Sequence, residues 1–200
     1  MKIIFATGNK GKLKEIQLIM EDLGVEVLSM KEAGIDIEIE ENGTTFEENA
    51  MIKAQAIAAF CKDEIVLADD SGLEIDYLNK EPGVQSSRFM GEDTPYEKKN
   101  SHILNLLEGV EESKRSARFV CTIAAVFPNG EKNVIRETIE GRIAYESRGT
   151  EGFGYDPIFY VPEFSCTTAE LTLEQKNQIS HRGKALEKMK EQIQKYMGTI

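Results

Sequence analysis

The sequence predicts an α/β protein, and three stretches of it support that fold class. The chain opens as a strand, a polar loop and an amphipathic helix, because an apolar run at 3–5 precedes apolar residues at helical spacing. Two segments rich in β-forming residues, 117–127 and 132–143, are joined by Asn129-Gly130, which is typical of a β-hairpin turn. A final amphipathic helix has an apolar face formed by Ala185, Leu186, Met189, Ile193 and Tyr196. Helices interspersed among strands in this way indicate a sheet flanked by helices.

A capping box predicts the helix 46–60, because Thr45 can accept a hydrogen bond at its start and Glu48 follows three residues later. The acidic segment before it, 35–40, alternates isoleucine with Asp or Glu. This alternation predicts an edge strand, followed by a turn at 42–43.

Another helix is predicted after Thr94, which is a suitable N-cap, with Pro95 at the first helical position and an end near Leu107. Two short strands are predicted at 25–28 and 72–78 from their alternating apolar residues.

Length and composition favour a single domain covering residues 1–200, although two closely apposed lobes would also fit. Hydrophobic residues make up 40% of the 200 residues, which is enough to form one core. No segment has the features of a secretory signal, and no apolar run approaches the roughly 18 residues of a membrane span. We therefore expect a soluble, cytoplasmic protein that has no membrane partner.

Charge and cysteine content argue against several other classes. The formal net charge of −11 disfavours a nucleic-acid partner, because such binding needs a basic surface that neutralises phosphates. Cys61, Cys121 and Cys166 are an odd number without C-x-x-C spacing, so neither a disulfide framework nor a zinc cluster is indicated.

The first loop, 7–12, has the chemistry of a phosphate-binding loop without matching a standard motif. Its sequence TGNKGK fails the P-loop pattern, because too few residues separate the glycines and Leu13 replaces the Ser or Thr that binds magnesium. Small residues at a helix N-terminus nevertheless expose backbone N–H groups to anions, and Lys12 adds a positive charge. A solvated surface loop is the alternative interpretation.

Two adjacent carboxylates, Asp69 and Asp70, follow the apolar run 65–68 and precede Ser71-Gly72. A simple turn would explain this composition, because Asp, Ser and Gly all favour tight turns. A second interpretation is that a strand ends here and presents metal-binding carboxylates, since open α/β sheets bind ligands at the carboxyl edge of their strands.

Two later segments carry groups that suit a nucleobase. The loop 153–157, FGYDP, contains two aromatic rings that either stack on a planar ligand or pack in the core. In the segment ISHRGKAL, Ser180 is a candidate N-cap, and His181 and Arg182 occupy the first helical turn, where the helix dipole disfavours cations. A nearby anion or acceptor would explain them, and Lys176 belongs to the same neighbourhood; solvated basic residues are the alternative.

Five segments together resemble the inosine/xanthosine triphosphate pyrophosphatase family in order and spacing. They are TGNKGK, TFEENA, LADDSGL, FGYDP and ISHRGKAL, and they cover essentially the whole chain. The resemblance implies an elongated mixed β-sheet flanked by helices, with two lobes and a central cleft. It also implies a homodimer.

The resemblance implies a Mg²⁺-dependent enzyme that cleaves ITP, dITP and XTP to the monophosphate and pyrophosphate by attack of a metal-activated water. Asp70 would be a metal ligand and the general base, and Glu41 a second ligand, for which Glu40 is the alternative. Lys12, Lys53 or the metal would neutralise developing charge. The residues expected to bind substrate are Thr7, Gly8, Asn9, Lys10, Gly11, Lys12, Ser71, Phe153, Gly154, Tyr155, Asp156, Lys176, His181 and Arg182.

Selectivity for these purines is expected to rest on the 6-keto oxygen, which accepts hydrogen bonds where the 6-amino group of adenine donates them. His181 and Arg182 are the expected donors. Two other functions stay open from the sequence. The protein could be a nucleotide-binding regulator without turnover, or an enzyme that hydrolyses modified pyrimidine triphosphates.

Overall fold

The structure is a computed structural model that describes residues 1–199. The strands are β1 (Lys2–Phe5), β2 (Glu26–Ser29), β3 (Ile65–Ile75), β4 (Ser116–Val126), β5 (Lys132–Ile143), β6 (Phe159–Val161) and β7 (Cys166–Thr167). The α-helices are α1 (Lys10–Met20), α2 (Phe46–Ala58), α3 (Tyr96–Leu106), α4 (Leu173–Ile179) and α5 (His181–Thr199). Helices and strands thus alternate along much of the chain, and the predicted α/β class is confirmed.

The strands form one mixed sheet in the order β2-β1-β3-β4-β5-β6-β7. Strand β1 pairs in parallel with both β2 and β3, whereas β5 with β6 and β6 with β7 pair antiparallel. The parallel part follows from the βαβ connection through α1, since parallel neighbours need a crossover.

The chain divides into two compact units. The first unit comprises Met1–Asp70, Cys121–Glu137 and the chain from Arg182 onward, and the second comprises Ser71–Val120 and Thr138–His181. Strands β3, β4 and β5 each contribute residues to both units.

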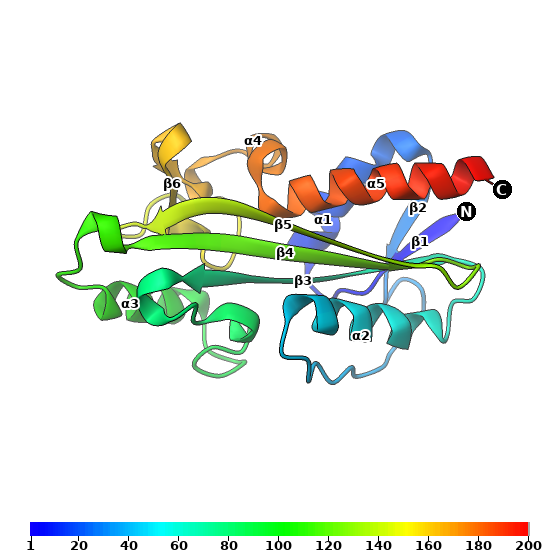
Figure 1. Cartoon of the computed structure of the whole chain (residues 1–200), viewed down its shortest axis with the longest axis horizontal. Coiled ribbons are helices and arrows are strands. Elements are labelled where there is room, and N and C mark those ends of the chain that lie inside the picture. The colour runs from blue at the N-terminus through cyan, green and yellow to red at the C-terminus, as the bar shows by residue number, and fades with distance from the viewer. Residues whose placement is uncertain (200) are drawn as a thin grey trace. The chain divides into compact units, whose positions relative to one another are not determined.

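In the first unit, helices cover both faces of the strands. Helices α1 and α5 pack on one face, where α5 contributes Leu186 and Met189 to a core that also contains β1, β3 and β4 side chains (Figure 1). Helix α2 packs on the other face through Ala50, Ala54 and Ile57 (Figure 1). These side chains belong to the apolar stripes predicted from helical spacing.

The second unit has its own core. Leu73 and Ile75 of β3 meet Ile103 of α3 and Phe159 of β6, and all four side chains are buried. Within residues 1–199, no helix is long and apolar enough to cross a membrane.

The acidic segment 35–40 is not the edge strand predicted from its alternation, because the structure assigns no strand between residues 30 and 64. Ile35, Ile37 and Ile39 instead pack as partly buried side chains against the core on the α2 side. The alternation therefore arises from a half-buried loop and not from a strand that is hydrogen-bonded in the sheet.

The carboxylate pair does not lie at the end of a strand or in a turn. Strand β3 runs without interruption from Ile65 to Ile75, so Asp69 and Asp70 lie in its middle, and the separate strand predicted at 72–78 is its second half. Asp69 and Asp70 are both buried. Turn-forming residues are tolerated here because long-range pairing and burial override local preference.

Two further predictions differ in detail. Helix α3 begins at Tyr96 with Pro95 as its N-cap, and the hydroxyl of Thr94 donates to the Met90 carbonyl at 2.7 Å instead of capping the helix. The short elements β6, β7 and α4 were not predicted, because segments of two to seven residues carry little periodicity.

Candidate functional site

The loop from Thr7 to Lys12 leads from β1 into α1. Asn9 is the N-cap of α1, and its Oδ1 accepts hydrogen bonds from the Gly11 nitrogen at 2.8 Å and the Lys12 nitrogen at 3.2 Å. Its own backbone N–H donates to the Thr7 hydroxyl at 3.1 Å. Three of the N–H groups expected to face an anion, those of Asn9, Gly11 and Lys12, thus have partners within the loop. Gly8, Asn9 and Lys10 are exposed.

A buried chain of charges starts at Lys12. Its Nζ lies 2.9 Å from Asp69 Oδ1, and Arg182 Nε donates to Asp69 Oδ2 at 3.2 Å. Arg182 Nη1 donates in turn to Glu15 at 2.5 Å. Asp69, Arg182 and Glu15 are each at most 2% exposed, so α1, β3 and the start of α5 are joined by paired charges.

The neighbouring carboxylate, Asp70, belongs to a second group of charges. Lys53 of α2 points its Nζ at Glu41 Oε2, 3.0 Å away, and at Asp70 Oδ1, 3.6 Å away. Asp70 Oδ2 is buried and has no hydrogen-bond partner within residues 1–199. The lysine therefore lies between the two carboxylates that the resemblance assigns to the metal.

Asp69 and Asp70 differ in their tendency to hold a proton. Burial by itself would raise the pKa of Asp69, but Lys12 and Arg182 outweigh it and hold that pKa well below its usual range. For Asp70, burial dominates, and its pKa is raised despite the opposing charge of Lys53. Burial would lower the pKa of Lys53, but Asp70, Asp69 and Glu41 together raise it. Asp70 is thus the stronger base of the pair.

The carboxylates of this group fit a magnesium ion. Mg²⁺ prefers oxygen ligands and commonly uses one or two carboxylates together with substrate phosphates and water. Glu41 and Asp70 provide two carboxylates beside one cation, and Asp70 Oδ2 is a buried oxygen without a partner. In the described part of the chain no set of three or more His, Cys, Asp or Glu is grouped for metal binding, so protein ligands alone would not complete the coordination.

The second unit contains the other predicted site residues, and Asp156 organises them. Its Oδ2 accepts from the Phe153 nitrogen at 2.7 Å and from Lys176 Nζ at 2.8 Å, and its Oδ1 accepts from the Thr168 hydroxyl at 2.8 Å. Lys176 Nζ also lies 4.6 Å from the centre of the Phe153 ring. Gly152 is required here, because a Cβ at that position would lie 2.2 Å from Asp156 Oδ2.

Tyr155 and Gly154 are held from the side of α3. The Tyr155 hydroxyl donates to the Ser86 carbonyl at 2.6 Å, and its ring meets Tyr96 edge-on at 5.2 Å. Asn100 Nδ2 donates to the Gly154 carbonyl at 3.1 Å. Tyr155 is 4% exposed, so this aromatic ring packs in the core, whereas Phe153 is partly exposed.

His181 and Ser71 complete the predicted set. The His181 ring stacks on Phe119 at 4.9 Å between ring centres, with an interplanar angle of 17°, and is 5% exposed. Ser71 lies in β3 directly after Asp70 and is partly exposed.

Sequence reasoning missed Glu15, Asn100 and Thr168, which hold predicted site residues in place. Glu15 did give a signal, because it follows Lys12 by three residues and precedes Ile19 by four, on the inward face of α1. The two others gave none, since their partners are distant in sequence.

The fold and the charged groups define a mixed α/β protein whose first unit carries two sets of paired charges, around Asp69 and around Asp70. The chain belongs to the Ham1 family, which residues 3–192 match. A dITP/XTP pyrophosphatase of Clostridium perfringens is 48% identical over 197 residues, covering 96% of this chain and 97% of that protein. The protein of that name from Bacillus subtilis is 48% identical over 186 residues, covering 93% of each chain.

Solved structures of the family share the fold. The HAM1 protein of Coxiella burnetii matches with a TM-score of 0.87 at 43% identity, covering 98% of this chain and 99% of that one. The Ham1 protein of Staphylococcus aureus matches with a TM-score of 0.86 at 41% identity, covering 98% of this chain and all of that one.

Proposed function

We propose that this protein hydrolyses deaminated purine nucleoside triphosphates, namely dITP, ITP and XTP, to the monophosphate and pyrophosphate. The names of relatives at nearly half identity and nearly full coverage support this activity. The observation that carries the proposal is the pair of carboxylates on either side of Lys53, which consists of the buried Asp70 and the partly exposed Glu41. Asp70 has a raised pKa, which suits a general base. A protein that only bound nucleotides would not need such a base.

Residues of the first unit act on the triphosphate in this proposal. Thr7 to Lys12 bind the phosphates, with the Lys12 ammonium held in place by Asp69. Lys53 neutralises negative charge that develops on the phosphates in the transition state. Glu41 and Asp70 would hold Mg²⁺, which supplies positive charge that makes the phosphorus more electrophilic.

Asp70 acts as the general base. The water oxygen forms a bond to phosphorus as the bridge between the α and β phosphates breaks, and pyrophosphate leaves. The proton of that water passes to the Asp70 carboxylate. A raised pKa suits this step, because a carboxylate of higher pKa takes a proton more readily.

Residues of the second unit contact the nucleobase in this proposal. Phe153 offers an aromatic face, and Lys176 and His181 offer N–H donors to a 6-keto oxygen. Arg182 was expected to be such a donor too, but its Nε and Nη1 already donate to Asp69 and Glu15. The main role of Arg182 in this proposal is to hold Asp69 in place.

A substrate panel tests the activity. Pyrophosphate release from ITP, dITP and XTP with Mg²⁺ is expected to exceed release from ATP by at least about 100-fold in kcat/KM, because the 6-amino group of adenine would leave N–H donors of the site unpaired. The panel also includes modified pyrimidine triphosphates. Binding without release would identify a regulator, and faster pyrimidine hydrolysis would identify the other enzyme class. A homodimer is proposed from the family resemblance, and light scattering of the purified protein tests it.

A further inference from the structure

Asn49 lies in α2 one turn before Lys53 and faces the interior, with none of its surface exposed. Its Oδ1 accepts a hydrogen bond from the Gly43 nitrogen at 2.8 Å. Gly43 lies two residues after Glu41 on the loop that enters α2. The side chain of Asn49 therefore fixes the loop that carries one of the two candidate metal ligands.

The contact between this loop and α2 is close. A Cβ at position 43 would lie 2.7 Å from both Asn49 Oδ1 and Glu48 Cβ, so only glycine allows the approach. Next to it, the Glu48 carboxylate accepts from the Thr44 nitrogen at 2.7 Å. These hydrogen bonds clamp the loop onto the first turn of the helix.

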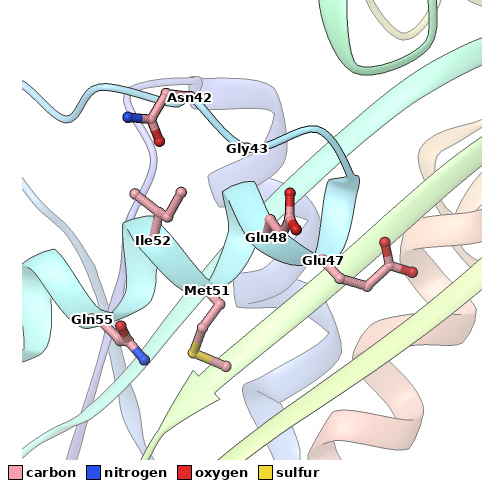
Figure 2. A pocket seen from close by; sticks show the side chains of 7 residues that line it. All are labelled: Asn42, Gly43, Glu47, Glu48, Met51, Ile52 and Gln55. Atoms are coloured by element: carbon pink, nitrogen blue, oxygen red, sulfur yellow. The ribbon is translucent and has the colours of Figure 1, made fainter.

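Beyond the clamp the loop is less supported. Figure 2 shows Asn42 and Gly43 on the loop that passes beside α2, with Ile52 on the helix below Asn42. A hollow of about 510 Å³ lies beside them, lined by Asn42, Gly43, Glu47, Glu48, Met51, Ile52 and Gln55. The bond from Gly43 to Asn49 therefore fixes the loop at the edge of this hollow, two residues after Glu41.

The Nδ2 end of the Asn49 carboxamide lies near Asp70. Burial raises the pKa of Asp70, and a hydrogen bond from the Asn49 side chain is among the influences that oppose that rise, so the two side chains lie within reach of each other. This contact falls short of a well-formed hydrogen bond, because Asn49 Nδ2 and Asp70 Oδ2 are both buried and neither has a partner of ordinary geometry in the described residues. A buried donor and a buried acceptor without partners are costly, which makes their pairing favourable once the charges around them rearrange.

We propose that Asn49 is a positioning residue that ties the Glu41 loop to Asp70, so that both carboxylates can meet one divalent cation. Its Oδ1 holds the loop through Gly43, and its Nδ2 would donate to Asp70 Oδ2 in the metal-loaded protein. This inference rests on the proposed function, because it assigns Glu41 and Asp70 to the metal.

Two substitutions separate the two ends of the carboxamide. Asn49→Leu keeps the branched shape of the side chain but removes both polar ends, and Asn49→Asp keeps an acceptor for Gly43 but removes the donor. Asn177→Leu is the matched control, because both polar ends of Asn177 are also buried and without a partner in the described residues, and Asn177 lies in α4 of the second unit.

The first measurement is Mn²⁺ binding to the full chain without nucleotide, followed by electron paramagnetic resonance. We expect Asn49→Leu to bind Mn²⁺ about 10 to 100-fold more weakly, the usual effect of losing a residue that orients metal ligands. Amide exchange at Gly43 should become faster in this variant and stay slow in Asn49→Asp. Asn177→Leu should match the wild type in both measurements.

The second measurement is steady-state hydrolysis of ITP. We expect kcat of Asn49→Asp to fall at least about tenfold with little change in KM, because the new carboxylate cannot donate to Asp70. The inference is overturned if Asn49→Leu binds Mn²⁺ within twofold of the wild type, or if Asn49→Asp keeps its kcat. A wild-type protein that binds Mn²⁺ in an Asn49-dependent way but hydrolyses no triphosphate would contradict the proposed function alone.

Discussion

Arg182 and Asp69 are 113 residues apart in the chain, yet Arg182 Nε donates to Asp69 Oδ2 at 3.2 Å and both side chains are buried. Asp69 holds Lys12 on its other oxygen. The pair therefore fixes a lysine of the proposed phosphate loop from inside the first unit. Because buried charges are stable only with their partners, each member depends on the others.

Replacing Arg182 by alanine is expected to destabilise the fold by about 3 to 5 kcal/mol, because it leaves Asp69 and Glu15 buried without that partner. The free energy of unfolding, measured by urea denaturation, gives the value. Lys14→Ala is the control, since Lys14 is exposed and should change stability little. A loss below about 1 kcal/mol for Arg182→Ala would show that this chain of charges is not important for stability.

Asp70→Asn is expected to leave a folded protein that releases pyrophosphate from ITP at least about 100-fold more slowly, since the amide cannot accept the proton. The fold should persist because the substitution keeps the shape of a side chain already poorly partnered. Single-turnover rates and circular dichroism measure the two effects. Substantial remaining turnover in the folded variant would remove Asp70 from the role of general base.

Thr168→Val removes the hydroxyl that donates to Asp156 Oδ1 and should loosen the Phe153 loop. We expect the KM for ITP to rise several-fold with a smaller change in kcat, and the stability to fall by about 1 to 3 kcal/mol, the cost of an unsatisfied buried acceptor. Steady-state kinetics and urea denaturation measure both effects. Thr122→Val, which removes an unpartnered hydroxyl, should change neither. Equal effects of the two substitutions would show that the hydrogen bond to Asp156 determines neither the KM for ITP nor the stability.

Asp76 links pH to stability in the second unit. Hydrogen bonds from Arg118 lower the pKa of Asp76 below its usual range, and the Lys80 and Ser116 side chains add to this effect. The unfolded chain thus binds a proton before the folded chain does as the pH falls. Stabilisation by ionised Asp76 is therefore complete above about pH 5, begins to fall as the pH drops through the ordinary aspartate pKa near 3.9, and is lost as the pH falls further through the lower pKa of the folded chain.

The variant Asp76→Asn should cost about 1 kcal/mol or less at pH 7, because the side chain is one-third exposed and solvent screens the pair. The difference from the wild type should shrink below about pH 4. Urea denaturation at several pH values measures it, and a constant difference down to pH 2 would contradict the assignment.

Local sequence determined much of the fold. The apolar faces of α1, α2 and α5, the Thr45 cap and the hairpin at Asn129-Gly130 all depend on residues within one or two turns of each other, so they could be predicted. The alternation at 35–40 gave a wrong prediction because half-buried loops and edge strands share the same pattern. The motifs that mark the family could likewise be recognised by order and spacing.

Only the tertiary structure decided which charges meet. The sequence marked Asp69 and Asp70 as a pair at a strand end, but their place within β3 and their different partners give them opposite pKa shifts. The sequence also predicted that Arg182 donates to the nucleobase, although its Nε and Nη1 donate to Asp69 and Glu15. The reason is physical: burial and long-range pairing set the energy of a charge, and neither can be inferred from its neighbours along the chain.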